Sequence, residues 1–448
     1  MRDSRAQTRA DLSGAPGGAF AAHAITASGA LPLVTSPEES TTMQSIMCPA
    51  CGSAGMDVFY ELERVPAHSV LLLATREEAV NYPRGDIRLG FCRSCGFISN
   101  TAFDPSLHEY SERYEETQGY SPTFNAFARR LAEYLVERYD LRGKDILEIG
   151  CGKGEFITLL CELGENRGVG IDPAYVAERS LAHPADRVTF ITDFYSEQYA
   201  HLRADFVVCK MTLEHIHHTA AFVGMVRRAL ADQPQTTVFF QIPDTTRVLE
   251  EIGFWDIYYE HCSYFTPGSL ARLFRRCGFD VIDLWRDYGD QYLMIEAQPG
   301  SGMGRAFPAL EHDLERTAAD VETFRREAPQ VLQRWREYLA QQHAAGRRVV
   351  LWGSGSKGVA FLTTLGIERE ITYTVDINPN KHGTFMAGTG QQIVGPAFLR
   401  DYQPDVVIVM NPIYRDEIQR DLTTLGVTAD VLSVEMFGRA ASALVGCA

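Results

Sequence analysis

Two C-x-x-C pairs are the residues whose spacing indicates chemistry most directly. They read Cys48-Pro-Ala-Cys51 and Cys92-Arg-Ser-Cys95. Four thiolates that converge on one tetrahedral Zn²⁺ leave no coordination position for water, so such a centre holds a small domain together and does no catalysis. We therefore expect a structural zinc module with these four cysteines as ligands, and a redox pair or a coincidence of spacing is the alternative.

Three acidic residues form a second group, because each stands near the end of an expected strand. Glu148 lies two residues before a turn with three glycines, Asp172 ends a strand expected over 168–172, and Asp193 ends one expected over 187–194. The carboxyl ends of parallel strands meet at one edge of a sheet, where ligands bind. A carboxylate before the glycine turn suits a cationic ligand and disfavours a dinucleotide. One such acid alone more commonly caps a helix, but three at successive strand ends indicate a site.

The second acid suits ribose hydroxyls, and the third, beside an aromatic ring, suits an adenine base. The ligand-binding residues expected at this edge are Glu148, Gly150, Gly152, Gly154, Asp172, Asp193, Phe194 and Met211.

Two Glu-His pairs supply groups for acid–base chemistry at the same edge. Glu214-His215 follows the fourth expected strand, and Glu260-His261 lies in an aromatic segment after the fifth. A histidine held at this edge can remove a proton from a bound acceptor. We expect His215 to be the base. Glu214 is expected to orient it or to contact the ligand that binds at the glycine turn. His261 is the rival base, a structural role for His215 is the alternative, and Tyr259 is expected to line the acceptor pocket with His261.

Alternating strands and helices must position these groups. They extend from about 104 to 299, where a Gly/Ser-rich stretch, 300–304, interrupts the pattern as flexible linkers do. A polar helical stretch, 306–343, leads into a second alternating segment that opens with a strand and the turn 353–358. Helix N-terminal amides together with Lys357 can hold an anionic group there, and the alternative is a duplicate that only builds an interface.

The middle of the chain resembles the class I S-adenosylmethionine-dependent methyltransferases. LEIGCGKGEF, GIDP and TDF match the first three motifs of that fold, and 279–297 has the form of its terminal antiparallel hairpin. The resemblance implies S-adenosyl-L-methionine as the methyl donor. The positive charge of its sulfonium explains why carboxylates surround the glycine turn.

The layout of the whole chain, over about residues 46–437, resembles the sugar C-methyltransferase family. The shared order is C-x-x-C…C-x-x-C, a methyltransferase core with Glu-His after the fourth strand, YYEHCSYF, and a G-x-G-x-K-G domain. Members carry a methyl group to C3 of 4-keto deoxysugars that are bound as nucleoside diphosphates. The resemblance implies that a histidine beside a glutamate removes the proton next to the ketone, a role that falls on His215 and Glu214. It also implies that the C-terminal domain closes over the substrate.

Two departures from that family lie on the acceptor side. The segment 114–122 matches the family's Y-x-Y-x-S-S linker only in part, and Thr212 stands where sugar-modifying relatives can carry a tyrosine. Both weaken the sugar assignment, and neither touches the donor site.

The predicted fold class is α/β. A Rossmann-like seven-stranded methyltransferase core is flanked by a small N-terminal zinc-binding module and by a second, C-terminal Rossmann-like α/β domain. The expected boundaries are a disordered extension at 1–44, the zinc module at 45–103, the methyltransferase domain at 104–300, and a helical linker with the C-terminal domain at 301–448.

Composition narrows the classes of partner. The 448 residues carry 58 acidic and 42 basic side chains, a formal charge of −16 that repels nucleic-acid backbones and disfavours RNA methylation. No run of 18 apolar residues exists, so we expect no membrane span. Ten unevenly placed cysteines predict the reducing cytoplasm, and the stretch 17–34 resembles a signal peptide only weakly.

The predicted function is S-adenosylmethionine-dependent C-methylation, next to a ketone, of a nucleotide-linked deoxysugar or a similar intermediate of natural-product or antibiotic biosynthesis. The alternative is O- or N-methylation of another small biosynthetic intermediate, and the acids at three strand ends disfavour a non-catalytic binding module. The expected partner is a small-molecule acceptor such as a nucleoside-diphosphate sugar, and the expected assembly is a monomer or a homodimer.

Overall fold

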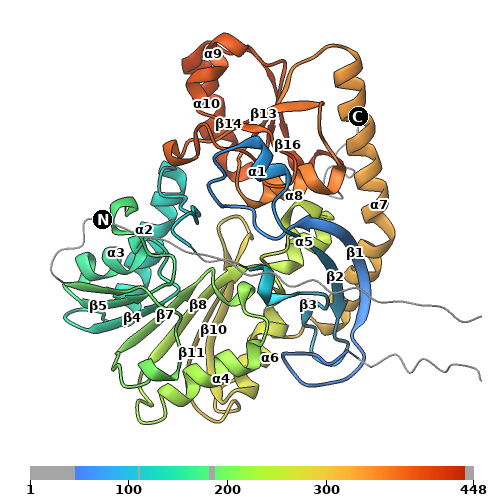
Figure 1. Ribbon diagram of the computed structural model, residues 1–448. Helices are drawn as coiled ribbons and strands as arrows, with labels where there is room; N and C mark the ends of the chain where they lie inside the picture. The colour runs from blue at the N-terminus through green and yellow to red at the C-terminus, as the bar shows by residue number, and fades with distance from the viewer. Residues whose placement is uncertain (1–45, 109–110, 181–186, 439–448) are drawn as a thin grey trace, which may run out of the picture. The chain divides into compact units, whose positions relative to one another are not determined.

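The computed structural model describes residues 46–108, 111–180 and 187–438. The extension and the signal-peptide-like stretch discussed for the first 44 residues lie outside the described residues. The described residues belong to one compact unit, which contains three β-sheets (Figure 1). This arrangement confirms the predicted α/β fold class.

The central sheet has seven strands in the order β10-β11-β8-β7-β4-β5-β6. Five of them pair in parallel, and β10 and β11 form an antiparallel hairpin that pairs antiparallel with β8. The strands are β4 (Asp145–Ile149), β5 (Arg167–Ile171), β6 (Val188–Ile191), β7 (Phe206–Lys210), β8 (Thr237–Pro243), β10 (Phe279–Asp287) and β11 (Tyr292–Pro299). The hairpin expected over 279–297 is therefore present.

Helices cover both faces of this sheet. Side chains along each strand point alternately to opposite faces, so apolar strands present an apolar surface on both sides. Phe206 and Val208 of β7 pack with α2 (Pro122–Arg138) and α3 (Glu155–Gly164) in one apolar cluster. Val207 packs in another with α4 (Thr219–Ala229) and α6 (Pro267–Arg276). The strands are thus buried on both sides, as their continuous apolar sequences predict.

The N-terminal module is a four-stranded sheet whose last strand comes from far along the chain. Its order is β1-β2-β3-β9, with β1 (Asp57–Pro66), β2 (Arg84–Phe91), β3 (Ile98–Asn100) and β9 (Ser263–Tyr264), and α1 (Arg76–Val80) lies between β1 and β2. The strand β9 begins two residues after His261 of the second Glu-His pair. The boundary expected between the zinc module and the methyltransferase domain, at residues 103 and 104, therefore stays a prediction.

The C-terminal segment builds a five-stranded parallel sheet in the order β14-β13-β12-β15-β16. Its strands are β12 (Val349–Trp352), β13 (Ile371–Val375), β14 (Gln392–Val394), β15 (Val406–Val409) and β16 (Asp430–Ser433). Its helices are α8 (Ser356–Leu365), α9 (Leu399–Tyr402) and α10 (Arg415–Leu425).

The polar helical stretch expected before this sheet is the 31-residue α7 (Leu314–Ala344), seen at the right of Figure 1. It packs against β1, α8 and α5 (Thr245–Glu251). Across the described ranges, no helix combines the length and the apolar character that a bilayer crossing needs.

Candidate active site

A cavity of about 930 Å³ runs along the carboxyl ends of β4, β7 and β8 and reaches the turn between β12 and α8. The cavity brings together most of the predicted donor and acceptor residues. Those that line it are Glu148, Gly150, Gly152, Asp172, Phe194, Met211, Glu214, His215 and His261. Three predicted residues are not among its lining residues: Gly154, Asp193 and Tyr259.

Glu148 at the end of β4 is a buried carboxyl group on the cavity wall. Its side chain is 2 % exposed, and its Oε2 atom has no hydrogen-bond partner among the described residues. Burial raises the pKa of Glu148, and the nearby Lys210 ammonium opposes this shift. Burial lowers the pKa of Lys210, whose Nζ lies 3.6 Å from the centre of the Phe156 ring. A cation that enters the cavity would find an unsatisfied carboxyl oxygen here.

The three glycines of the turn after β4 all have positive φ: 70° at Gly150, 55° at Gly152 and 81° at Gly154. A Cβ atom at each position would meet the protein itself, namely the side chains of Thr212, Glu116 and Phe190 in that order. Gly150 and Gly152 also line the cavity, so the close approach of a ligand to this turn stays a prediction. The chain's own packing already requires glycine at these positions.

Asp172 and Asp193, at the next two strand ends, differ in whether they line the cavity. Each carboxylate oxygen of Asp172 accepts one backbone N–H, from Gly152 at 2.9 Å and from Ala174 at 2.8 Å, and the residue lines the cavity. The carboxylate of Asp193 instead accepts from the hydroxyl of Tyr199 at 2.6 Å and from two other donors. Only the neighbouring Phe194, 59 % exposed, reaches the cavity.

Two histidines meet at the acceptor side of the cavity. His215 ends a short 3-10 turn after β7, and His261 lies just before β9. The Nε2 atom of His261 lies 3.0 Å from the hydroxyl of Tyr258. Burial and the neighbouring His261 lower the pKa of His215 well below 6.5, and burial together with Lys357 lowers that of His261 to about 3. Both rings are therefore neutral at pH 7 and can accept a proton.

Glu214 lies beside these histidines and is 1 % exposed. One ligand atom each of Glu214, His215 and His261 lies within 4.8 Å of the other two. Burial raises the pKa of Glu214 to about 8. Neither of its carboxyl oxygens has a hydrogen-bond partner among the described residues.

Tyr259 lies outside this group. Its hydroxyl accepts the backbone N–H of Asp104 at 2.7 Å and donates to the carbonyl oxygen of the same residue at 3.2 Å. The ring is 1 % exposed and packs on Phe103. The structure therefore uses Tyr259 to fix the chain after β3, and the neighbouring Tyr258 occupies the expected place on the cavity wall.

A second layer behind His215 includes residues that sequence reasoning did not find. His108 stacks on His68 with ring centres 4.7 Å apart and faces His215 at 6.1 Å. Nδ1 of His68 lies 2.7 Å from Oε1 of Glu260, whose other oxygen accepts the backbone N–H of Ser69 at 3.0 Å. Neither His68 nor His108 belongs to a recognisable motif, so no local signal could have identified them.

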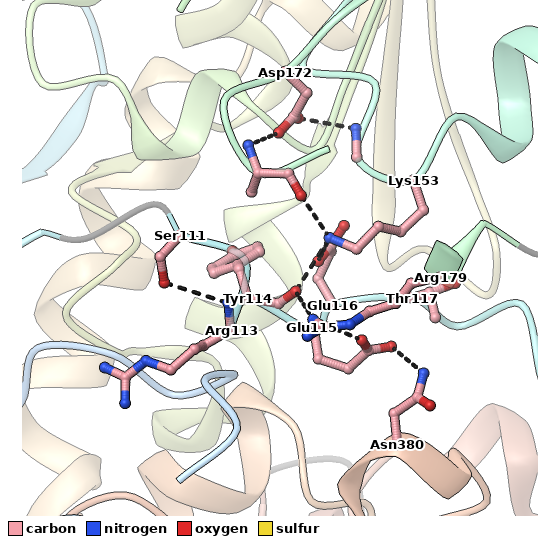
Figure 2. A network of polar contacts seen from close by, with 12 residues as sticks. Ser111, Arg113, Tyr114, Glu115, Glu116, Thr117, Lys153, Asp172, Arg179 and Asn380 are labelled. Atoms are coloured by element: carbon pink, nitrogen blue, oxygen red, sulfur yellow. Dashed lines mark hydrogen bonds and ion pairs between the residues drawn. The ribbon is translucent and has the colours of Figure 1, made fainter. Parts of the chain in front are cut away.

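The segment 111–121, which we call the strap, overlaps the linker noted at 114–122, but its polar contacts, shown in Figure 2, were not predicted. Lys153, from the glycine turn, donates to the carbonyl oxygen of Tyr114 at 3.1 Å and to Glu116 at 3.3 Å. Glu115 is fully buried and accepts from Asn378 of the C-terminal segment at 2.8 Å. The strap therefore connects the glycine turn after β4 to the C-terminal segment.

The turn after β12 forms the far side of the cavity. Gly355, Ser356 and Lys357 line it, and Nζ of Lys357 lies 2.8 Å from the carboxylate of Asp256. Arg247 and Lys381 also line this side, and each is paired with an acidic side chain. This part of the cavity therefore carries three cationic groups together with the carboxylates that pair with them.

The four cysteines of the two C-x-x-C pairs converge as their spacing predicts. The sulfur atoms of Cys48 and Cys95 are 3.7 Å apart, those of Cys51 and Cys92 are 3.6 Å apart, and all four lie within 4.8 Å of one another. A tetrahedron with metal–sulfur bonds of about 2.3 Å has edges of about 3.8 Å. The cluster therefore has the size that a Zn²⁺ ion needs.

Comparisons with known proteins assign two parts of the chain. Residues 121–284 match the family model described as a methyltransferase domain, and residues 305–428 match the C-methyltransferase C-terminal domain. Over 308 residues, the chain is 29 % identical to the C-methyltransferase NovU of Streptomyces niveus. The matched residues cover 65 % of this chain and 72 % of that protein.

Solved structures resemble a smaller part. One is the 1,6-didemethyltoxoflavin-N1-methyltransferase of Burkholderia thailandensis, with 1,6-didemethyltoxoflavin and S-adenosylhomocysteine bound. It is 20 % identical to this chain, and the match covers 41 % of this chain and 82 % of that chain, with a TM-score of 0.32. The magnesium protoporphyrin IX methyltransferase of Synechocystis, with S-adenosylhomocysteine bound, is 19 % identical over 40 % and 84 %, with a TM-score of 0.31. Likenesses of this extent say nothing about the acceptor.

Proposed function

The chain is an S-adenosylmethionine-dependent methyltransferase, and we propose that it methylates a carbon atom next to a ketone in a small, anionic, nucleotide-linked metabolite. The observation that carries the proposal is that one cavity has an unsatisfied buried carboxyl, Glu148, on its donor side and the neutral pair His215 and His261 on its acceptor side. The printed name of the relative, a C-methyltransferase, supports carbon as the methylated atom.

The donor residues fit a sulfonium compound. Glu148 offers an unpartnered oxygen to a positive charge, and Asp172 retains lone pairs for the ribose hydroxyls. The exposed ring of Phe194 offers a face for the adenine. When bound, S-adenosylmethionine supplies an electrophilic methyl group.

In the proposed reaction, His215 removes the proton from the carbon next to the ketone, and the resulting carbanion is held in the cavity as its enolate. His261, oriented by the hydroxyl of Tyr258, is the second candidate for this step. The neutral state of both rings at pH 7 supports either assignment. The proton later leaves the histidine to solvent, which restores the base for the next turnover.

The far side of the cavity supports an anionic acceptor. Arg247, Lys357 and Lys381 lie there, and a diphosphate can displace the carboxylate partner of Lys357, which is Asp256. A nucleoside-diphosphate sugar has this charge and a suitable size for a cavity of about 930 Å³. The four cysteines hold a structural Zn²⁺ in the same proposal, because their sulfur atoms already have the spacing of a closed Cys₄ site.

Deuterium exchange tests the reaction class. The protein is incubated in D₂O with a nucleoside-diphosphate 4-keto deoxysugar and sinefungin, a cationic donor analogue that cannot transfer a methyl group. We expect deuterium at the carbon next to the ketone, seen by NMR, and none with the His215→Ala variant. No exchange in this incubation, together with methyl transfer to oxygen or nitrogen in a parallel incubation with S-adenosylmethionine, would support the alternative function and reject this one.

A further inference from the structure

We propose that Glu214 acts as a carboxylic acid that donates a hydrogen bond to the acceptor's carbonyl oxygen as negative charge develops there. This inference rests on the proposed function, because it needs an acceptor that forms an enolate. It assigns a catalytic role to a residue for which the sequence suggested only orientation of His215 or contact with the donor.

The position of Glu214 is the first argument. The residue lines the cavity, and its ligand atom lies within 4.8 Å of those of His215 and His261. Both of its oxygens lack a hydrogen-bond partner among the described residues, although the side chain is 1 % exposed. An unpartnered buried polar group is costly, so a group of this kind on a cavity wall indicates a contact made only when a ligand is bound.

The surroundings of Glu214 are the second argument, because they disfavour the charged form. The ionisable groups that face it are the two histidines of the pair, Cys209 of β7, Tyr258, Cys262 and Tyr292 of β11. None of these is a cation at pH 7, and no lysine or arginine of the described ranges forms an ion pair with Glu214. Burial accordingly raises its pKa to about 8, which leaves a proton to donate at pH 7.

A contrast with Glu148 separates the two carboxyl groups by role. Burial raises the pKa of both carboxyl groups to about 8, but Glu148 faces Lys210, whose positive charge favours its ionised form. Glu214 has no such cation and lies beside the proposed base. Two carboxyl groups in one cavity whose environments differ in this way can serve as an anion and as an acid.

The chemistry requires such an acid. The same burial that keeps His215 neutral makes it a weak base, so removal of the proton needs stabilisation of the oxygen at the other end of the enolate. His215 takes the proton from carbon, and the C–H electron pair forms the C=C bond while the carbonyl electrons move to oxygen, which Glu214 hydrogen-bonds. The carbon then bonds to the methyl group, the C–S pair stays on sulfur, and the C=O bond re-forms as Glu214 keeps its proton.

Infrared difference spectroscopy tests the protonation state without any acceptor. With sinefungin bound at pH 7, we expect a carboxylic-acid carbonyl band in the wild type that is missing in Glu214→Gln and retained in Glu133→Gln, an exposed glutamate on α2. A carboxylate band from Glu214 would overturn the inference. So would loss of the acid band on addition of Mn²⁺, which would make the residue a metal ligand. Should Glu214→Gln fail to fold, Glu214→Leu replaces it in the same comparison, because burial also raises the pKa of Glu148 to about 8 and a titration of the wild type alone would not tell the two groups apart.

Kinetics provide the second readout. Glu214→Leu should lose roughly 10²–10³ in kcat, whereas Glu214→Gln, which keeps a neutral N–H donor, should lose about tenfold. Equal losses in both variants would overturn the role as a donor. A failed exchange experiment with an intact acid band would reject the proposed function, whereas normal exchange with an ionised Glu214 would reject this inference alone.

Discussion

The imidazole rings of His215 and His261 meet edge to face, with ring centres 4.8 Å apart and planes at 86°. One ring is placed by the turn after β7, and the other by the segment that leads into β9. The proposed acceptor base is therefore assembled from two loops at the carboxyl edge of the sheet. Its two candidate atoms can be distinguished only by substituting the rings one at a time.

Substitution of the base should reduce turnover and spare donor binding. We expect His215→Ala to lower kcat by roughly 10²–10⁴ while the Kd for S-adenosylmethionine, measured by calorimetry, changes little. His201→Ala, an exposed histidine, is the matched control. If His261→Ala shows the larger loss in kcat, the base is His261; if donor affinity falls as far as kcat, His215 is structural.

The pH dependence of kcat follows from the directions of the pKa shifts. Both histidines have lowered pKa values and stay neutral from pH 6 upward, so the rate should be level near neutral pH. Glu214 must keep its proton, which it loses as the pH rises through about 8, so kcat should fall above that pH. At saturating donor and acceptor, the alkaline decline should be missing in Glu214→Gln, and a decline that persists there has another origin.

Glu148→Gln should reduce the preference for the charged donor. S-adenosylhomocysteine carries the same ammonium group but no sulfonium, so the ratio of its Kd to that of S-adenosylmethionine isolates the sulfonium charge. Burial raises the pKa of Glu148, and a nearby cation favours its ionised form, so this ratio should rise with pH in the wild type. It should be smaller and level in Glu148→Gln. A ratio that is the same in both proteins would place the sulfonium elsewhere.

Loss of one thiolate should remove the metal. We expect about one Zn²⁺ per chain in the purified wild type and none in Cys92→Ala, measured by elemental analysis, together with a lower thermal unfolding midpoint. Cys277→Ala, outside the cluster, should retain the metal. Because β3 pairs with β9 at Ile98 and Tyr264, close to His261 in sequence, the metal-free protein should also lose turnover. Absence of metal from carefully prepared wild type would leave the cysteines as a buried thiol cluster.

The strap should contribute to stability through Glu115. Its carboxylate is fully buried and accepts from Asn378, with Arg179 3.5 Å away. Glu115→Ala leaves these donors unsatisfied and should cost about 1–3 kcal/mol of unfolding free energy, measured in urea. Glu112→Ala, an exposed neighbour, should cost little. Similar small losses in both variants would mean that the strap is held by its other contacts.

The sequence predicted the parts of the site that follow from local patterns. Glycine turns, acids at strand ends and paired cysteines mark the core and the metal cluster, because a short stretch of chain fixes their geometry. The strands β4 and β5 and the hairpin of β10 and β11 are present where the patterns indicated.

Contacts between distant segments could not be predicted in this way. His68 meets Glu260 across 192 positions, and β9 joins a sheet whose other strands end at Asn100. Tyr259 and Tyr258 are adjacent in sequence and identical in type, yet only Tyr258 reaches the cavity. Asp193 matched the expected motif, but the hydroxyl of Tyr199 occupies its carboxylate. In each case the outcome depends on what the folded chain brings opposite the residue.

The hydrogen bond between Ser69 and Ser356, 2.8 Å long, joins the loop after β1 to the first residue of α8. Together with the bond from Asn378 to Glu115, it ties the C-terminal segment to loops that carry the acceptor and donor groups. Chimeras that exchange this segment with that of a homologue to alter selectivity would therefore have to carry both serines and the Glu–Asn pair along. A cut at the linker alone would separate residues that hydrogen-bond to each other.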